Sequence, residues 1–405
     1  MPGPLAGVRV VDFTGVVSGP LATMFLADQG ADVVKIEPLD GDITRRSRQP
    51  IDKAGEFSAL FISSNRGKRS LAIDAKAPAG REVIMKLVAG ADVLVQNFRP
   101  GAMERLGLGA EQLAKIFPRL IYASISGVGE SGPYAKKRVY DPIIQGLSGL
   151  SDIQADPATK RPRMVRTIIA DKTTAVFCAQ AITSALYARE RTGQGQHIKV
   201  AMLDVMLAHL WPEGMMQYTV VGAEATTADP NSRPDQVFES SDGYITVGTI
   251  SDSEWAGFCA AAGRPGLKDD ERFKTASGRF MNAGERLELM ADLIKLKSTA
   301  DWLERLDAAD VPSAPILRRN ELVNNEQVVA RQLIAEFEQP NVGRVRQPVP
   351  AARFEGTPSA IHGPAPRVGE HSEEVLRELG YDDSQIAALL RAGVIRGNGL
   401  SEETE

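Results

Sequence analysis

The chain of 405 residues is 43% hydrophobic and 24% charged, which is typical of a globular protein large enough for two domains. Its formal net charge of −5 argues against a general nucleic-acid binder. The first residues lack the pattern of a signal peptide, and no apolar run approaches the roughly 20 residues that cross a bilayer. We therefore expect a cytoplasmic protein without membrane or nucleic-acid partners. The two cysteines, Cys178 and Cys259, lack metal-ligand spacing, so no disulfide framework or zinc site is indicated.

Apolar runs and helical patterns alternate along the first third of the chain. Strands are expected at residues 8–13, 32–36, 71–73, 92–96 and 120–125, and helices at residues 21–28, 83–88 and 113–116. This alternation indicates an α/β fold with a doubly wound, mostly parallel, Rossmann-like sheet. Binding sites of such sheets lie beyond the carboxyl ends of the strands. The polar residues expected at that edge are Thr14, Glu37, Asn97, Ser126 and Asp171.

Asp171 follows an apolar segment, Met164–Ala170, and precedes a helical pattern over Ala175–Arg189. The apolar segment predicts a buried strand, so Asp171 is expected at a strand-to-helix turn. Asp is a preferred N-cap residue, and beginning the helix would be a sufficient role for Asp171. Alternatively, a carboxylate held among helix N-terminal amides stays ionised and can face a substrate lying over the strand ends. The two roles are compatible.

The character of the sequence changes after Trp211. Residues 225–315 begin with a turn-rich stretch and continue with strand and helix patterns, which predict a smaller α/β domain. The large domain is expected to comprise residues 1–210, and residues 325–405 are expected to return to it and complete it.

Six short sequence segments occur in a fixed order along the chain. They are Phe13–Pro20, Gly30–Pro38, Asn97–Gly101, Tyr187–Asp204, Gly369–Ser372 and Leu379–Tyr381. With these segments the sequence closely resembles the class III coenzyme A transferases, the CaiB/BaiF type that includes formyl-CoA and carnitine-CoA transferases. The resemblance spans nearly the whole chain. It implies a large domain whose halves are separated by a small domain, and an interlocked homodimer.

The resemblance also implies roles for particular residues. Asp171 matches the nucleophile, and Tyr140 matches a tyrosine on the substrate side of the nucleophile. Val16 and Val17 match positions beside the thioester. The positions that the family uses around CoA are matched by Lys76, Asn97, Phe98, Arg105 and Arg138. CoA and acyl-CoA act as substrates, and no metal or permanently bound cofactor is implied.

Two departures from the family pattern bear on the reaction. Formyl-CoA transferases carry a glutamine at the position of Val17 and a run of glycines at the position of Asp229–Asp235, so formyl transfer is disfavoured. The related 2-methylacyl-CoA racemases place a histidine before an aspartate where this chain has Tyr140 and Asp141. Since removal of an α-proton needs an acid and base pair, the missing histidine weighs against a racemase or isomerase, which stays the alternative.

The predicted reaction transfers CoA from an acyl-CoA donor to an organic carboxylic acid, through an aspartyl anhydride and an aspartyl-CoA thioester. Succinyl-CoA is a common donor in the resembled family. Arg163 and Arg166, or the cluster near Arg45, could attract a dicarboxylate substrate. A CoA-binding protein without catalysis is a third hypothesis, which the presence of Asp171 opposes.

Overall fold

The computed structural model describes residues 3–47, 50–156, 158–222 and 235–398. The chain forms two compact units, each with its own core. The larger unit comprises Met1–Asp152, Arg163–Pro212 and Gln332–Glu405, and the smaller comprises Ile153–Pro162 and Glu213–Arg331. This division places residues 153–162 and 325–331 in the smaller unit, whereas the sequence pattern assigned them to the large domain.

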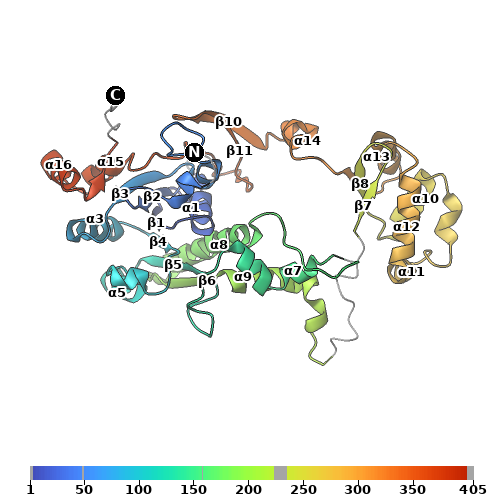
Figure 1. The fold of residues 1–405 in the computed structure, drawn as a ribbon, viewed down its shortest axis with the longest axis horizontal. Coiled ribbons are helices and arrows are strands. Elements are labelled where there is room, and N and C mark those ends of the chain that lie inside the picture. Colours follow the sequence, from blue (N-terminus) through green and yellow to red (C-terminus); the bar gives the residue numbers. More distant parts are fainter. Residues whose placement is uncertain (1–2, 48–49, 157, 223–234, 399–405) are drawn as a thin grey trace. The chain divides into compact units, whose positions relative to one another are not determined.

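A seven-stranded sheet forms the centre of the larger unit (Figure 1). Its strands, in spatial order, are β12 (Ile395–Arg396), β3 (Arg69–Ile73), β2 (Asp32–Glu37), β1 (Arg9–Phe13), β4 (Val93–Gln96), β5 (Ile121–Ser126) and β6 (His197–Ala201). Val11 of β1 pairs with Val34 of β2 on one side and with Leu94 of β4 on the other. Only β12 runs antiparallel to its neighbour among these described strands. The predicted α/β fold with a mostly parallel sheet is therefore confirmed.

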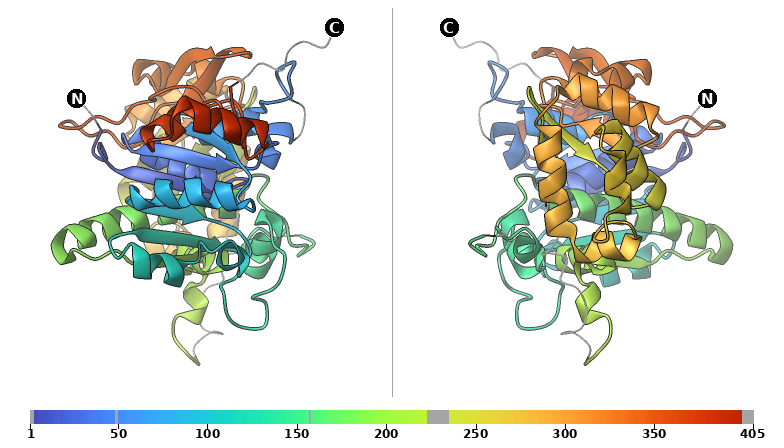
Figure 2. Two further views of the ribbon diagram at one scale, coloured as in Figure 1. Left: turned by 90° about the vertical axis from the view of Figure 1, so that its left-hand side faces the viewer. Right: turned by 90° about the vertical axis from the view of Figure 1, so that its right-hand side faces the viewer.

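Helices cover both faces of this sheet, as the alternating strand residues require. Val10 and Val33 pack on one face, and Val11 and Val34 pack on the other. The first face carries α1 (Ser18–Asp28) and α8 (Ile169–Thr192), and the second, seen in Figure 2 (left), carries α3 (Pro78–Ala89), α5 (Ala110–Ile116), α15 (Ser372–Glu378) and α16 (Asp383–Arg391). The chain moves outward from β1 to β3 and then returns to β4. The loops after β1 and β4 consequently lie at the point where a doubly wound sheet opens a crevice.

The remaining elements of the larger unit lie in the connections and after the return of the chain. They are α2 (Ala59–Asn65), α4 (Ala102–Arg105), α6 (Asp141–Leu147), α7 (Leu150–Ile153), α9 (Met202–Gly214) and the hairpin of β10 (Ile334–Gln339) and β11 (Gly343–Pro348), of which α7 and α9 extend to the boundary with the smaller unit. No helix within the described ranges is both long and apolar enough to span a bilayer.

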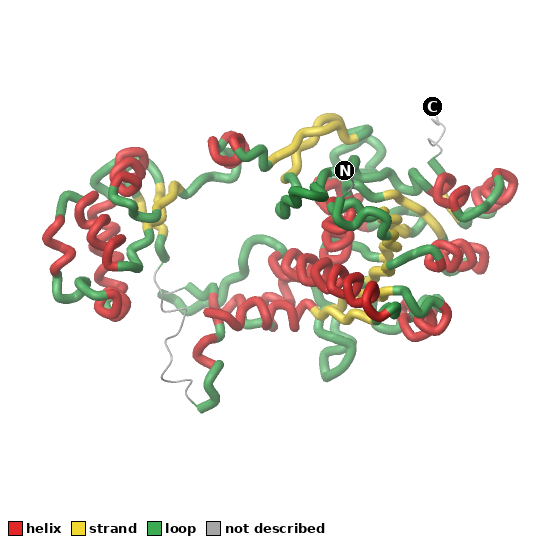
Figure 3. The backbone as a smooth tube through the Cα atoms, turned by 180° about the vertical axis from the view of Figure 1, so that it is seen from behind, coloured by secondary structure: helices red, strands yellow, loops and turns green. Residues whose placement is uncertain are grey.

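The smaller unit packs helices against a short antiparallel sheet (Figure 3). Its elements are β7 (Val237–Glu239), β8 (Tyr244–Val247), β9 (Ser313–Pro315), α10 (Asp252–Ala261), α11 (Ala276–Met281), α12 (Ala283–Ile294), α13 (Thr299–Ala308) and α14 (Glu326–Ala330). Aromatic rings dominate its core, where Phe258 stacks with both Trp255 and Trp302, at centroid distances of 5.8 and 6.0 Å. These large rings bury much apolar area for a small fold.

The strand predicted over Met164–Ala170 is wrong. The segment is irregular, and α8 begins within it at Ile169. The side chain of Met164 is 52% exposed, so the apolar residues that suggested a strand are not all in the core. The backbone N–H of Val165 donates to Oε1 of Gln145 at 3.0 Å instead of to a neighbouring strand. A side chain therefore satisfies a backbone group that the prediction assigned to the sheet.

Candidate functional site

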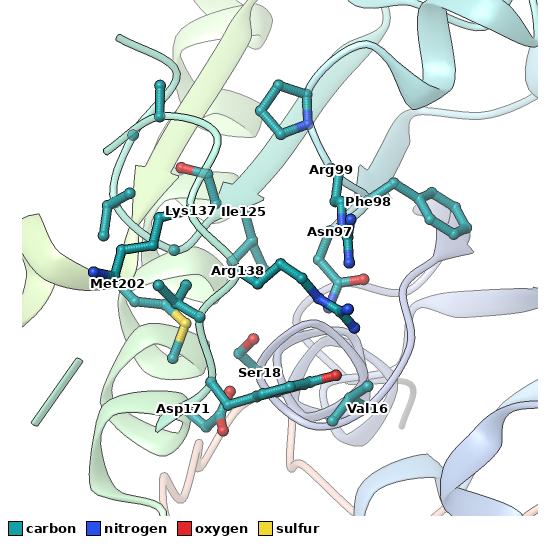
Figure 4. Close-up of a pocket in the computed structure, with 18 residues that line it drawn as sticks. Val16, Ser18, Asn97, Phe98, Arg99, Ile125, Lys137, Arg138, Asp171 and Met202 are labelled. Carbon is teal, nitrogen blue, oxygen red and sulfur yellow. The ribbon is translucent and has the colours of Figure 1, made fainter. Parts of the chain in front are cut away.

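A cavity of about 220 Å³ lies beyond the carboxyl ends of β1, β4 and β5, entirely within the larger unit. Predicted site residues that line it are Val16, Asn97, Phe98, Arg138, Tyr140 and Asp171 (Figure 4). A second cavity of about 480 Å³ lies between the loops that follow β1, β2 and β4, and it shares Val16, Asn97 and Phe98 with the first. Residues predicted from different parts of the sequence thus meet around two adjoining cavities.

Three of the predicted residues lie elsewhere. Val17 is 5% exposed and is the N-cap residue of α1, so its side chain belongs to the core. Lys76 is exposed in the loop between β3 and α3, and Arg105 is exposed at the end of α4. Neither basic residue lines the two cavities. Their predicted contacts with CoA would therefore be made outside these cavities.

Asp171 lies in the first turn of α8, but it does not cap the helix. That role belongs to Asp141, whose Oδ2 accepts hydrogen bonds from the backbone N–H groups of Ala170 at 2.7 Å and of Asp171 at 3.2 Å. Asp141 is 2% exposed, and its Oδ1 accepts a 2.6 Å bond from Gln145. A negative charge at a helix N-terminus satisfies otherwise unpaired amides. The carboxylate of Asp171 is consequently left available to the cavity.

The environment of Asp171 favours its protonated form. Burial, and then the negative charge of Asp141, raise the pKa of Asp171 to about 6. Hydrogen bonds from the hydroxyl and the backbone N–H of Ser18 act in the opposite direction. Ser18 lies next to Asp171 in Figure 4, at the first residue of α1, and it is 4% exposed. The result is a carboxylate that is mostly ionised at neutral pH but poorly solvated, and such a group is a stronger nucleophile than one in water.

The loop between β1 and α1 has an unusual backbone. Val16 has a φ of +69°, a conformation that a β-branched residue adopts only under constraint, at a cost of about 1–3 kcal/mol. The two preceding residues are fixed by side chains. Thr14 N donates to Asp12 and Thr14 O accepts from Lys35, while Gly15 N and O both bond to the side-chain amide of Asn97. These contacts from the sheet and its loops thereby hold the backbone of Val16 in this conformation.

Buried ion pairs lie beside the loop between β1 and α1. Asp12 pairs with Lys68 at 3.0 Å, and Lys35 pairs with Asp42 at 3.0 Å, all with side chains at most 3% exposed. Burial alone would raise the pKa of Asp12, but Lys68 and Lys35 outweigh it and hold the pKa below the ordinary value. Arg45 is also buried, and its guanidinium bonds Glu37 at 2.6 Å. Arg45 itself is therefore held by the fold and cannot attract a substrate, although the sequence analysis considered the basic cluster around it for that role.

Cationic side chains gather at the mouth of the smaller cavity. Arg99, Lys137 and Arg138 line it and are exposed. Lys137 lies over the ring of Tyr134, 5.0 Å from its centroid, and within the described residues none of the three forms an ion pair. Unpaired cations beside a cavity attract anionic ligands. Of Asp229–Asp235, the segment that stands where formyl-CoA transferases carry a run of glycines, all but Asp235 lie outside the described residues.

Sequence patterns missed Ser18 and Asp141. Ser18 precedes Pro20 and directly follows the loop after β1, which is a signal for a helix start earlier than the predicted residue 21. Asp141 precedes Pro142 at the beginning of α6, also a helix-start pattern, but nothing local indicates that it reaches the N-terminus of another helix. That second role depends on tertiary packing.

A doubly wound α/β fold that gathers a poorly solvated carboxylate and exposed cations at the carboxyl edge of its sheet has the features of a site for anionic ligands. The model of CoA-transferase family III matches residues 5–372, and the chain belongs to this family. It is therefore an enzyme of the CoA-transferase class.

Similar proteins with assigned activities include several CoA-transferases. Human succinyl-CoA:glutarate CoA-transferase is 35% identical over 97% of this chain and 90% of its own length. Succinate–glutarate CoA-transferase of Agrobacterium fabrum is 35% identical over 93% and 96%, and succinyl-CoA:mesaconate CoA-transferase of Haloarcula marismortui is 36% identical over 94% and 97%. The crystal structure of a CaiB/BaiF family protein from Brucella suis is 34% identical, with a TM-score of 0.81 over 94% of this chain and 100% of that one.

Proposed function

We propose that the protein transfers CoA between dicarboxylic acids, with succinyl-CoA as donor and Asp171 as the nucleophile. The observation that carries the proposal is the placement of Asp171. Its carboxylate lines a cavity between the N-termini of α1 and α8, and the capping of α8 falls to Asp141. A carboxylate that is poorly solvated and is not needed to cap the helix is suited to attack a carbonyl.

The reaction would proceed by four acyl transfers. The carboxylate of Asp171 attacks the thioester carbonyl, which forms a mixed anhydride and releases the CoA thiolate. The thiolate then attacks the carbonyl of Asp171, which forms an aspartyl-CoA thioester and releases the first acid as its carboxylate. The acceptor carboxylate attacks this thioester and again releases the thiolate. Finally the thiolate attacks the acyl carbonyl of the second anhydride, giving the new acyl-CoA and free Asp171.

The chain's own groups would assist these steps by position. Ser18 holds the carboxylate of Asp171 through its hydroxyl and N–H. Val16 lies at the same cavity, where its strained peptide would face the thioester, and Tyr140 contributes a phenol that is 61% exposed. Water would hydrolyse either anhydride, so transfer requires that bound substrates exclude it from the small cavity.

We infer that the nucleotide end of CoA occupies the larger adjoining cavity. Ile43 and Phe98 line it and are 75% and 46% exposed, which is unusual for apolar side chains unless they contact a ligand. A purine base can stack on Phe98, since every base has an apolar face. Arg138 would then bind the phosphates from the smaller cavity, and Lys76 and Arg105 from outside both cavities, as the family resemblance implies.

A dicarboxylic acid is the acceptor class that the cavity favours. Arg99 and Lys137 offer positive charge to one carboxylate of such an acid while its other carboxylate reaches Asp171. The similar proteins named above carry succinate or succinyl-CoA, glutarate and mesaconate in their names. We also infer a homodimer from the family resemblance. Val176 and Phe177 on α8, which are 55% and 39% exposed, are apolar surface that a second copy could cover.

Mass spectrometry of the protein after incubation with succinyl-CoA and separate dicarboxylic acids tests this function. We expect a hydroxylamine-sensitive adduct on Asp171 and a new acyl-CoA with glutarate or a similar acid. Asp171→Ala should form neither product while still binding CoA, and retained transfer by this variant would eliminate Asp171 as the nucleophile. Deuterium uptake at an acyl α-carbon, without transfer, would instead support the racemase alternative.

A further inference from the structure

The backbone at the junction of the two cavities is held by an unusual set of contacts. All four polar groups of the Thr14 and Gly15 backbones are bonded to side chains. Asn97 supplies two of these bonds, because its Oδ1 accepts from Gly15 N at 2.9 Å and its Nδ2 donates to Gly15 O at 2.8 Å. Asn97 thus pairs with Gly15 as a neighbouring strand would, at the end of β4, where the sheet itself has stopped.

The residue that follows this pair is Val16, the one β-branched residue with positive φ among those that the structure describes. A backbone in this conformation persists only where its surroundings leave it no alternative. Asp12 and Lys35, both completely buried, fix Thr14, and Asn97 fixes Gly15. Of these three side chains, only Asn97 is directly bonded to the residue next to Val16.

Val16 also lines both cavities, the one that contains Asp171 and the larger one. Val16 shares this place with Asn97 and Phe98, and the three residues form the boundary that a ligand occupying both cavities would cross. A displacement of this boundary would move the reacting carbonyl relative to Asp171. A misplacement of about 1 Å can cost about 100-fold in rate, even when binding is little affected.

We propose that Asn97 is a positioning residue, which clamps Gly15 and thereby holds Val16 in the left-handed conformation that aligns the acyl thioester with Asp171. The proposal rests on the CoA-transferase function proposed above. It differs from the role implied by the family resemblance, in which Asn97 contacts CoA itself. The two roles predict different kinetics, because a ligand contact acts on affinity and a clamp acts on the rate of the bound complex.

The test compares Asn97→Ala, Asn97→Asp and Phe98→Ala with the wild type in single-turnover release of CoA thiolate from saturating succinyl-CoA. The Asp variant keeps the shape and the acceptor for Gly15 N–H but loses the donor to Gly15 O. We expect both Asn97 variants to slow the saturated rate by about 10-fold to 100-fold, with less than about threefold change in CoA dissociation constant. Phe98→Ala, which changes a cavity wall without touching Gly15, should show the opposite balance and raise the CoA dissociation constant by a larger factor than it slows the saturated rate.

A second variant, Val16→Gly, checks that Asn97 acts through the backbone of Val16. Glycine adopts positive φ without strain, so Asn97→Ala should reduce the saturated rate less in the Val16→Gly background than in the wild type. The thermal midpoints of the wild type, Asn97→Ala, Val16→Gly and the double variant should show the same coupling, and this measurement does not require activity. Strong loss of CoA affinity in Asn97→Ala at an unchanged saturated rate, or effects that simply multiply, would overturn the clamp. If the wild type transfers no CoA but the four thermal midpoints are coupled, the proposed function is rejected while the clamp of Gly15 by Asn97 is retained.

Discussion

The opposite effects of Ser18 and Asp141 on Asp171 predict opposite shifts of one pH profile. Only the ionised carboxylate attacks a thioester, so the rate of the first step should rise with pH with a midpoint near the pKa of Asp171, about 6. Ser18→Ala removes a hydrogen bond that favours the ionised form, and the midpoint should move up. Asp141→Asn removes a negative charge that disfavours it, and the midpoint should move down.

The size of the Ser18 effect follows from the strength of the lost bond. A hydrogen bond to a charged acceptor contributes about 1.5 kcal/mol at the lower end of its range, and one pKa unit corresponds to about 1.4 kcal/mol. The midpoint of Ser18→Ala should therefore lie near pH 7. At pH 6.5 about 76% of the wild-type carboxylate and about 24% of the variant carboxylate would be ionised. The variant should be about threefold slower at pH 6.5 and nearly equal to the wild type at pH 8.5.

Rapid-quench measurement of CoA thiolate release at saturating succinyl-CoA, from pH 5 to pH 9, gives this profile directly. Saturation matters because a phosphate group also titrates near pH 6 and can alter binding. Other charged groups that face the cavity are Lys137, Arg138 and Arg99, and these remain in every variant. A loss of rate in Ser18→Ala that is the same at all pH values, or a midpoint that moves down, would refute the assigned role of Ser18.

Three further predictions concern stability and shape. Because the pKa of Asp171 is raised, the folded protein loses stability as pH rises from about 4 to beyond 6. Asp171→Asn should therefore melt at a higher temperature than the wild type, by a larger margin at pH 8 than at pH 5. The gain is at most about 3 kcal/mol before solvent screening of this half-buried group is allowed for, and equal midpoints at pH 8 would contradict the raised pKa. Lys68→Met leaves buried Asp12 without its partner and should cost about 3–5 kcal/mol in urea unfolding, against little effect for the exposed Lys86→Met. Gly127→Ala would place a methyl group 1.8 Å from Cγ2 of Val139, displace the cavity wall beside Tyr140 and raise the KM for acyl-CoA by about tenfold, whereas Gly146→Ala, with open space around it, should not.

The elements that could be predicted from sequence are those with local patterns. Alternating apolar runs indicated β1, β2, β4 and β5 with their helices, and the parallel sheet brought the loops at Val16 and Asn97 together as expected. The strand before Asp171 was predicted wrongly because an apolar run does not distinguish a strand from a segment anchored by the side chain of one glutamine, Gln145. Local sequence carries no information about such a partner, which lies about 20 residues away.

The same limit applies to the site. Sequence reasoning gave Asp171 the choice of capping α8 or facing a substrate, and it could not know that Asp141 takes the first role from another helix. Ser18 was likewise invisible, since its bonds to Asp171 depend on how α1 packs against α8. Conversely, Arg45 has the residue type of a ligand contact, but its burial beside Glu37 excludes that role.

The capping of α8 by Asp141 has a practical consequence for trapping complexes. Because the helix start does not depend on the side chain at position 171, Asp171→Asn should keep the cavity walls in place while removing the attacking oxygen. Crystals of that inert variant could then be soaked with donor and acceptor together, and the unreacted pair would reveal which acid the enzyme has been built to recognise.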